Sequence, residues 1–268
     1  MNPYLIKLGS YGIRWYSALI LVGVILAIVL IKKEGKRFAI SGDDMFNMAF
    51  WTIIIGIIGA RLYYVLFNFS LYKHDPVSIL KIWEGGLAIH GGIIAGVLTV
   101  LFYCKKHELR FIRVTDIAAP ALILAQAIGR WGNFFNSEAH GAATSLAHLK
   151  ALHIPAFIIK GMHISGVYYE PTFLYESLFC LLGFIIMIII RRTKYIKVGV
   201  ITSFYLIYYA TVRFFIESMR TDSLMLGGFK MAQIVSVIMF IIGLVSLILI
   251  IRKGKYEDLY NQTYDKNK

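Results

Sequence analysis

Long apolar stretches alternate with short polar segments along most of the 268-residue chain. A helix needs about 20 apolar residues to cross the hydrocarbon core of a bilayer, and most of the stretches approach that length. The pattern predicts seven transmembrane helices, over residues 16–31, 45–69, 87–104, 117–129, 172–190, 198–218 and 231–251. We therefore expect an all-α polytopic membrane protein, with residues 1–268 forming a single integral membrane domain.

Composition supports a membrane protein. The chain is 58% hydrophobic and 16% charged, whereas soluble domains are about 45–50% apolar and about 25% charged. Its 28 Lys and Arg against 15 Asp and Glu leave a net charge of +13. Such an excess alone would suggest nucleic-acid binding, but with this hydropathy it favours basic cytoplasmic loops, and no nucleic-acid partner is expected. Two cysteines exclude a disulfide framework.

Basic residues gather in alternate connections between the predicted helices. Seventeen of the 28 follow the first, third, fifth and seventh helices: Lys32, Lys33, Lys36, Arg37, Lys105, Lys106, Arg110, Arg113, Arg191, Arg192, Lys194, Lys197, Arg252, Lys253, Lys255, Lys266 and Lys268. Because basic loops stay in the cytoplasm, the N-terminus is predicted outside and the C-terminus inside. The polar cytoplasmic tail, 252–268, is expected to fray.

The longest connection, 132–171, lies between helices four and five on the outer side of the membrane. Residues 155–160 and 161–169 alternate in polarity, which predicts a small β-rich extracytoplasmic cap. The connection also holds four histidines whose spacing matches no known zinc pattern, so loop polarity explains them better than metal binding does.

Arg130 follows the shortest apolar run. Thirteen helical residues rise only about 20 Å, so either Asp116 or Arg130 lies below the membrane surface, or the helix ends early in a cavity. The surrounding Gly129, Gly132 and two asparagines favour an early end. The alternative for Arg130 is that its side chain reaches the outer headgroups.

The sixth helix carries an unusual polar face, made by Tyr205, Tyr209, Arg213, Glu217 and Arg220. Residues at this spacing share one side of a helix, and a polar side must face protein or water rather than lipid. The alternative is a structural Arg213–Glu217 pair that neutralises itself. For Arg61 in the second helix, structural pairing with a carboxylate is the favoured interpretation.

The predicted helix directions bring these polar residues to one level of the membrane. Tyr16, His90, and Tyr175 with Glu176 begin helices that run inwards, while Arg130 and Arg213 lie near the ends of helices that run outwards. We expect one polar chamber in the outer half of the bilayer, open to lipid. Guanidinium groups match phosphate oxygens, so the sequence predicts phospholipid binding. A flippase without covalent chemistry, an intramembrane protease and a purely structural protein are rival interpretations.

Residues 129–141 read GRWGNFFNSEAHG. This segment resembles the signature of the prolipoprotein diacylglyceryl transferases, and the resemblance extends over nearly the whole chain. It includes residues 14–16 (RWY), 90–92 (HGG), 171–176 (PTFLYE) and the spacing of polar residues between Tyr209 and Arg220. Two positions depart from the family pattern: Ser17 replaces the usual Gly, and Glu170 replaces the usual His.

The resemblance implies seven spans with an extracytoplasmic cap, in the bacterial cytoplasmic membrane, with the active site towards the outer leaflet. It implies transfer of the sn-1,2-diacylglyceryl group from phosphatidylglycerol to the lipobox cysteine of a prolipoprotein signal peptide. The products would be a thioether and glycerol 1-phosphate, with no metal or cofactor.

The resemblance also maps site residues onto this chain. The expected catalytic residues are His90, Arg130, Tyr209 and Arg213. The expected substrate-binding residues are Tyr16, Asn133, Asn136, Glu138, Gly141, Glu217 and Arg220. In our hypothesis the two arginines hold the phosphate, Asn133 and Tyr16 orient the headgroup, and either His90 or Tyr209 assists deprotonation of the thiol.

Overall fold

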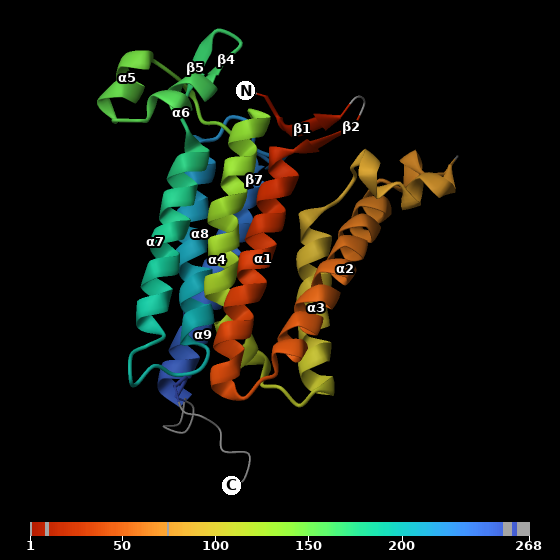
Figure 1. Ribbon diagram of the computed structural model, residues 1–268, viewed down its shortest axis with the longest axis vertical. Coiled ribbons are helices and arrows are strands. Elements are labelled where there is room, and N and C mark those ends of the chain that lie inside the picture. The colour runs from red at the N-terminus through yellow and green to blue at the C-terminus, as the bar shows by residue number, and fades with distance from the viewer. Residues whose placement is uncertain (1, 9–10, 74, 254–258, 262–268) are drawn as a thin grey trace. The chain divides into compact units, whose positions relative to one another are not determined.

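The computed structural model describes residues 2–8, 11–73, 75–253 and 259–261, which are mainly helical (Figure 1). Seven helices in these ranges are long and apolar enough to cross a membrane, as predicted. They are α1 (Trp15–Gly35), α2 (Gly42–Phe67), α3 (Ile89–Lys106), α4 (Phe111–Asn136), α7 (Thr172–Ile190), α8 (Val200–Met219) and α9 (Met231–Lys253). Where the structure describes them, their connections contain short helices and strands.

The chain divides into two compact units, which we describe separately. The first comprises Met1–Leu30 and Thr115–Lys268, and the second comprises Ile31–Val114. In the first unit, most of α1 and α4 and all of α7, α8 and α9 lie beside one another (Figure 1). Its core is built from small and aliphatic side chains on three helices: Ala119, Ile123, Ala127, Cys180, Met187 and Ile201. Small residues allow helices in lipid to pack closely.

Helix α4 is longer than its hydrophobic run predicts. It spans 26 residues and continues beyond Arg130 to Asn136, so the expected early end in a cavity is wrong. Asp116 and Arg130 both lie inside the helix. Asp116 is fully buried and accepts hydrogen bonds from the backbone N–H groups of Gly199 (2.5 Å) and Thr202 (2.8 Å). It therefore caps the start of α8, where a carboxylate also suits the helix dipole.

The connection between α4 and α7 is folded. It contains β3 (Ala143–Thr144), α5 (Leu146–Ala151), α6 (Ala156–Gly161), β4 (His163–Ile164) and β5 (Val167–Tyr169). The strands form an antiparallel sheet in the order β3-β5-β4. The strand prediction is right for His163–Ile164 and Val167–Tyr169 and wrong for Ala156–Gly161, which is helical. There the adjacent side chains Ile158 and Ile159 are both buried, with Met162 one turn later, and this is a helical pattern.

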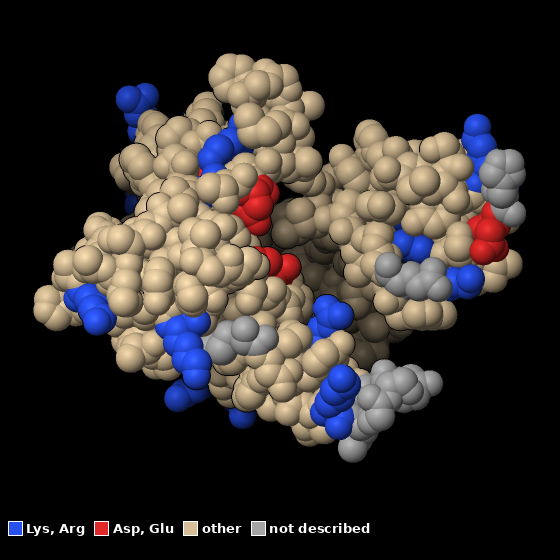
Figure 2. All heavy atoms as spheres, turned by 90° about the horizontal axis from the view of Figure 1, so that it is seen from above, with Lys and Arg blue, Asp and Glu red and all other residues tan. Residues whose placement is uncertain are grey.

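Two hairpins frame the same end of the first unit (Figure 1). Strands β1 (Tyr4–Leu8) and β2 (Tyr11–Arg14) precede α1, and strands β6 (Met225–Leu226) and β7 (Phe229–Lys230) join α8 to α9. The helices themselves expose many large apolar side chains, among them Leu21, Phe179 and Ile241. Seen from above, Lys and Arg are scattered over a surface made mostly of other residue types (Figure 2). Helix surfaces with exposed apolar side chains, such as those of Leu21, Phe179 and Ile241, suit contact with lipid.

The C-terminal tail is ordered at Leu259–Asn261. Tyr260 is fully buried, and its N–H donates to the carbonyl oxygen of Ile196 at 2.7 Å. The Asn261 amide donates to the carbonyl oxygen of Thr193 at 2.8 Å. These three residues therefore pack on the α7–α8 connection, contrary to the expected fraying, because an apolar pair interrupts the polar tail. The rest of the predicted tail beyond Lys253 lies outside the described residues.

In the second unit, α2 and α3 pack against each other. A Cβ at Gly91 would overlap the side chain of Tyr63 and the carbonyl oxygen of Gly59, so only glycine permits this approach. Gly92 is also close to α2, because a Cβ there would lie 3.4 Å from the carbonyl oxygen of Gly56. Three short 3₁₀ helices, η2 (Phe69–Leu71), η3 (Pro76–Leu80) and η4 (Ile82–Glu84), connect α2 to α3.

Arg61 of α2 anchors this connection. Its guanidinium donates hydrogen bonds of 2.7–3.0 Å to four backbone carbonyls, those of Ser78, Ile79, Gly85 and Gly86. It also lies 5.1 Å from the ring centre of Tyr72. The expected carboxylate partner is replaced by carbonyl dipoles, but the structural role is retained, because a buried charge needs compensation from polar groups of some kind.

Candidate active site

The polar centre of the first unit is Glu176, in the second turn of α7. Its side chain is only 2% exposed, and each carboxylate oxygen faces a different arginine. Arg130 Nη2 of α4 lies 3.0 Å from Oε1, and Arg213 Nη1 of α8 lies 3.2 Å from Oε2. A buried carboxylate is costly unless it is paired. The two guanidinium groups supply that pairing and join three helices.

Tyr209 of α8 belongs to the same cluster. Its hydroxyl accepts a hydrogen bond from Arg130 Nη2 at 3.3 Å and donates one to Glu176 Oε1 at 3.5 Å. One turn earlier, Tyr205 stacks nearly parallel to Tyr209, and its hydroxyl accepts from the Gln126 amide at 3.0 Å. The predicted polar face of α8 is therefore turned towards α4 and α7, inside the protein.

Arg213 is shared between two carboxylates. Its Nη2 lies 2.6 Å from Glu217 Oε2 on the same helix, while its Nη1 contacts Glu176. The alternative of a self-contained Arg213–Glu217 pair is therefore wrong. Glu217 is 3% exposed and also lies 3.7 Å from Arg220 Nη1. Arg130 is 21% and Arg213 is 16% exposed, so neither side chain is fully buried.

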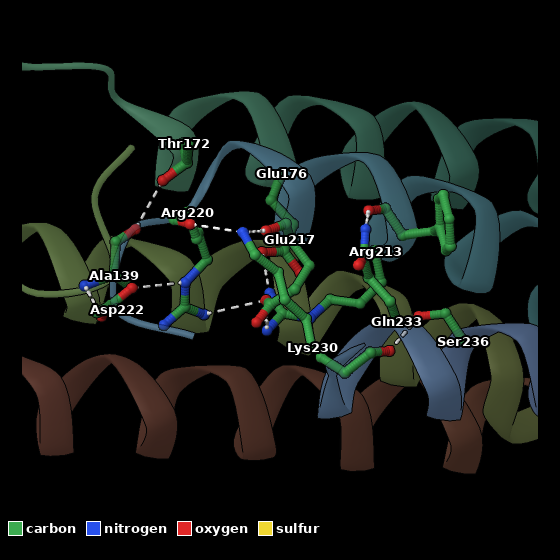
Figure 3. A network of polar contacts seen from close by, with 12 residues as sticks. Ala139, Thr172, Glu176, Arg213, Glu217, Arg220, Asp222, Lys230, Gln233 and Ser236 are labelled. Carbon is green, nitrogen blue, oxygen red and sulfur yellow. Dashed lines mark hydrogen bonds and ion pairs between the residues drawn. The ribbon is translucent and has the colours of Figure 1, made fainter. Parts of the chain in front are cut away.

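The network continues past the end of α8 (Figure 3). Arg220 Nε donates to Asp222 Oδ1 at 3.0 Å, and the N–H of Ala139 donates to Asp222 Oδ2 at 3.2 Å. Lys230 Nζ donates to the carbonyl oxygens of Glu217 and Arg220, both at 2.7 Å. A cation at these carbonyls satisfies the last turn of the helix.

The carboxyl of Asp222 reflects this surrounding charge. Partial burial raises its pKa, but the hydrogen bond and positive charge of Arg220, together with backbone N–H groups, lower the pKa by more. The net pKa lies below the ordinary aspartate value. Asp222 therefore ionises more readily than an ordinary aspartate, and it ties the segment after α4 to the connection between α8 and α9.

Gly141 occupies a backbone junction in this region. Its N–H donates to the carbonyl oxygen of Glu170 at 2.9 Å, and it forms an isolated bridge with Arg220. A Cβ at Gly141 would lie 2.7 Å from Glu170 Cβ, which excludes a side chain here. Thr172 Oγ1 donates to the carbonyl oxygen of Ala139 at 2.6 Å. These contacts hold the two ends of the α4–α7 connection together at the start of α7.

The two predicted asparagines lie in the last turns of α4 with a common partner. The Asn133 and Asn136 amides each donate to Glu138 Oε1 at 3.2 Å. Asn133 stands one turn beyond Arg130 on the same helix. Ser137 and Ala139, with φ of 55° and 58°, turn the chain so that Glu138 reaches back to them.

Tyr16 lies beside this end of α4. A Cβ at Gly132 would stand 2.6 Å from Tyr16 Cδ2, so the glycine lets the tyrosine ring approach the helix backbone. The neighbouring Trp15 stacks on Phe135 with ring centres 4.8 Å apart. The first turn of α1 is therefore packed against the turn that carries Asn133.

His90 belongs to the second unit. It is half-buried in the first turn of α3, and its ring centre lies 6.3 Å from that of Tyr63. The other ten predicted site residues all belong to the first unit. In that unit a continuous set of contacts joins Arg130, Tyr209, Arg213, Glu217 and Arg220.

Sequence reasoning missed the central role of Glu176. Its position near a helix start suggests an ordinary dipole partner. Its place in the expected polar chamber was predicted, but no role in the site was. The signal that could have identified that role is charge balance, because Arg130, Arg213 and Arg220 need carboxylate partners, and of the carboxylates only Glu138 and Glu217 are among the expected site residues. Asp222 was missed because it lies in the bend between α8 and β6, where an aspartate is commonly a turn residue.

The family of the chain follows from comparison with known proteins. Residues 3–249 match the family model of prolipoprotein diacylglyceryl transferase. The chain therefore belongs to this family of membrane transferases. Similar proteins named phosphatidylglycerol–prolipoprotein diacylglyceryl transferase occur in Ligilactobacillus salivarius (48% identity, covering 90% of each chain) and in Staphylococcus haemolyticus (47% identity, covering 98% of this chain and 92% of the relative). The relative from Staphylococcus saprophyticus is 45% identical and covers 96% of this chain and 91% of its own.

Proposed function

We propose that this chain transfers the sn-1,2-diacylglyceryl group of phosphatidylglycerol to the lipobox cysteine of prolipoproteins, the first step of bacterial lipoprotein maturation. The observation that carries the proposal is the pair of arginines on Glu176. They come from two helices, share one buried carboxylate, and keep part of their side-chain surface exposed. The same cluster adjoins the segment 129–141 that resembles the family signature.

The proposed reaction exchanges one bond for another at a glyceryl carbon. The cysteine sulfur forms a C–S bond with the carbon that carries the phosphate, and the C–O bond to the phosphate oxygen breaks. The bonding electron pair leaves with that oxygen, so glycerol 1-phosphate departs. The thiol proton goes to a base on the enzyme and from there to solvent or product.

Arg130 and Arg213 would stabilise the leaving phosphate. A phosphodiester carries one negative charge, and the phosphomonoester product approaches two near neutral pH. Preorganised donors aimed at developing charge are commonly the largest contribution in such sites. Guanidinium groups already held by Glu176 and Tyr209 need little reorganisation when charge develops.

The attacking thiol needs deprotonation, because a free cysteine has a pKa of about 8.5. His90 and Tyr209 remain the two candidates for the base. An imidazole exchanges protons readily near neutral pH, which favours His90. Tyr209 is already bonded to Arg130 and Glu176, which favours a positioning role for its hydroxyl.

The remaining site residues would bind the headgroup and the peptide. Asn133 and Tyr16 lie beside the α4 turn next to Arg130, where their polar groups suit the glycerol hydroxyls. Asn136 and Glu138 extend that polar edge. Glu217 and Arg220 hold Arg213 and the backbone at Gly141 in place.

The proposed location is the bacterial cytoplasmic membrane, with this site towards the outer leaflet. Basic residues in the last turns of α1, α3 and α9 support an inner position for those ends: Lys32, Lys33, Lys105, Lys106, Arg252 and Lys253. The connection between α4 and α7 would then form an extracytoplasmic cap. Partners are phosphatidylglycerol, signal peptides with a lipobox cysteine, and the bilayer.

Reconstitution tests the function. Purified protein is mixed with phosphatidylglycerol and a lipobox peptide, and release of glycerol phosphate is followed. Release that depends on the cysteine supports the transferase. No release, or equal release with a Cys→Ser peptide, would overturn it, and movement of lipid between leaflets without release would indicate a flippase.

A further inference from the structure

We infer that Glu176 is a positioning residue that also sets how tightly the site retains its phosphate product. The inference rests on the proposed function, in which Arg130 and Arg213 hold the phosphate. The carboxylate would align the two guanidiniums before substrate binds. Its negative charge would then weaken their hold on glycerol 1-phosphate, so that product leaves.

The geometry supports the alignment. Glu176 is 2% exposed and lies beneath two arginines that are 21% and 16% exposed. Each of its oxygens is used by one arginine, so the spacing between the two guanidiniums is set by the width of one carboxylate. Ser177, the next residue, donates to the carbonyl oxygen of Ala127 at 2.9 Å and accepts from Trp131 Nε1 at 3.1 Å. Helix α7 is therefore fixed against α4 at this level.

The charges support the effect on product release. The ion pairs of the described network join three arginines, Arg130, Arg213 and Arg220, to the three carboxylates of Glu176, Glu217 and Asp222. These six charges balance. Without the charge of Glu176, the other five residues would carry one excess positive charge next to the proposed phosphate position.

An excess positive charge would favour the product more than the substrate. The product carries about two negative charges and the lipid carries one, and electrostatic attraction grows with the product of the charges. An enzyme that binds its product more tightly turns over more slowly, since only stabilisation confined to the transition state raises kcat. The counter-charge of Glu176 would prevent that retention.

The test measures binding of glycerol 1-phosphate to the purified full chain in detergent by calorimetry, with inorganic phosphate as a second probe. For Glu176→Gln we expect at least about tenfold tighter binding of glycerol 1-phosphate, with a lower KM for phosphatidylglycerol and a lower kcat. For Glu176→Asp, which keeps the charge but shortens the reach, we expect affinity near wild type and a lower kcat.

Glu170→Gln is the matched control. Glu170 lies just before the same helix and contacts Tyr175 and His148 rather than the arginines. Removing its charge should leave the affinity for glycerol 1-phosphate within about twofold of wild type, if short-range pairing dominates. An equal gain in this control would show a general field effect and overturn the specific role of Glu176.

Binding by Glu176→Gln that is no tighter than wild type would overturn the inference, whatever happens to turnover. If Glu176→Gln does not fold, an unchanged kcat in Glu176→Asp would by itself overturn the proposed alignment of the two guanidiniums by Glu176. The binding measurements need no catalysis, so their outcome is separate from the reconstitution assay. If the wild-type chain transfers lipid but Glu176→Gln binds glycerol 1-phosphate no more tightly, the proposed function stands and this inference is wrong.

Discussion

Two regions of the molecule place arginine within membrane-spanning helices and compensate it differently. In the second unit, Arg61 is 6% exposed and donates to four backbone carbonyls. In the first unit, Arg130 and Arg213 share the carboxylate of Glu176 and stay partly exposed. The residue type is the same, but the partners are neutral dipoles in one case and an anion in the other.

The difference separates a structural arginine from one suited to a ligand. The bonds of Arg61 engage every nitrogen of its guanidinium and fix the connection between α2 and α3. Arg130 and Arg213 are only partly buried by their partners, and in the proposed function this exposed part contacts the phosphate. An ionisable residue in a membrane helix is therefore informative only when its partners are known.

The largest effect is expected when the paired arginines lose their forked geometry. Arg213→Lys and Arg130→Lys keep the charge but remove the ability to contact Glu176 and a phosphate together. We expect each to lower kcat/KM for lipid transfer by about 10²–10³-fold, measured as glycerol phosphate release. Arg252→Lys, at the far end of α9, is the control and should match wild type. Near wild-type rates in both test variants would contradict the phosphate clamp.

The next effect tests whether the second unit is purely structural. If His90 is the base, His90→Gln should lower the rate at neutral pH by about 10²-fold. The rate should recover in part near pH 9, because the free thiol ionises without help at about pH 8.5. Tyr209→Phe, measured in parallel, should show no such recovery. Full turnover of His90→Gln at pH 7 would rule out this base and leave only structural roles for the unit.

A smaller effect is expected from Arg61 itself. Arg61→Lys loses several charged hydrogen bonds to carbonyls and should destabilise the protein by about 1.5–3 kcal/mol, visible as a lower unfolding temperature in detergent. Transfer activity of the folded fraction should change far less than in Arg213→Lys. If Arg61→Lys abolished activity at unchanged stability, the contrast between the two kinds of arginine would be lost.

The smallest effect concerns the outer part of the network. Because the folded-state pKa of Asp222 is lowered, its ionised form stabilises the fold above the unfolded-state pKa of about 3.9. That stabilisation is lost as pH falls through the folded-state pKa. Between pH 5 and pH 3, wild type should therefore lose slightly more thermal stability than Asp222→Asn. Parallel pH profiles for the two proteins would contradict the contribution of the Arg220–Asp222 pair.

Hydrophobic length predicted the membrane helices well, with α4 as the exception. Its run of 13 apolar residues ends at polar residues on both sides, so a rule based on hydropathy ends the helix there. In the structure the buried Asp116 caps α8 and Arg130 is paired with Glu176. Polar partners on other helices satisfy both residues, which allows α4 to continue through them.

The site was predictable in part. Helix periodicity placed Tyr209, Arg213 and Glu217 on one face, and helix direction brought Arg130 to the same end of the bundle. The choice of partners was not predictable, because Glu176, Glu217 and Asp222 were all possible neighbours of the arginines. Which carboxylate meets which guanidinium depends on the rotation and depth of each helix, and these follow from packing.

The sequence by itself determined the number of candidate spans, the polar face of α8, and the family resemblance carried by residues 129–141. Apolar length, helical spacing and charge asymmetry are local properties that can be read along the chain. Only the tertiary structure decided that Glu176 bridges Arg130 and Arg213, that Ala156–Gly161 is helical, and that Arg61 binds carbonyls. Each of these depends on which distant groups meet where water is excluded, because a buried charge must be matched by whatever partner packing provides.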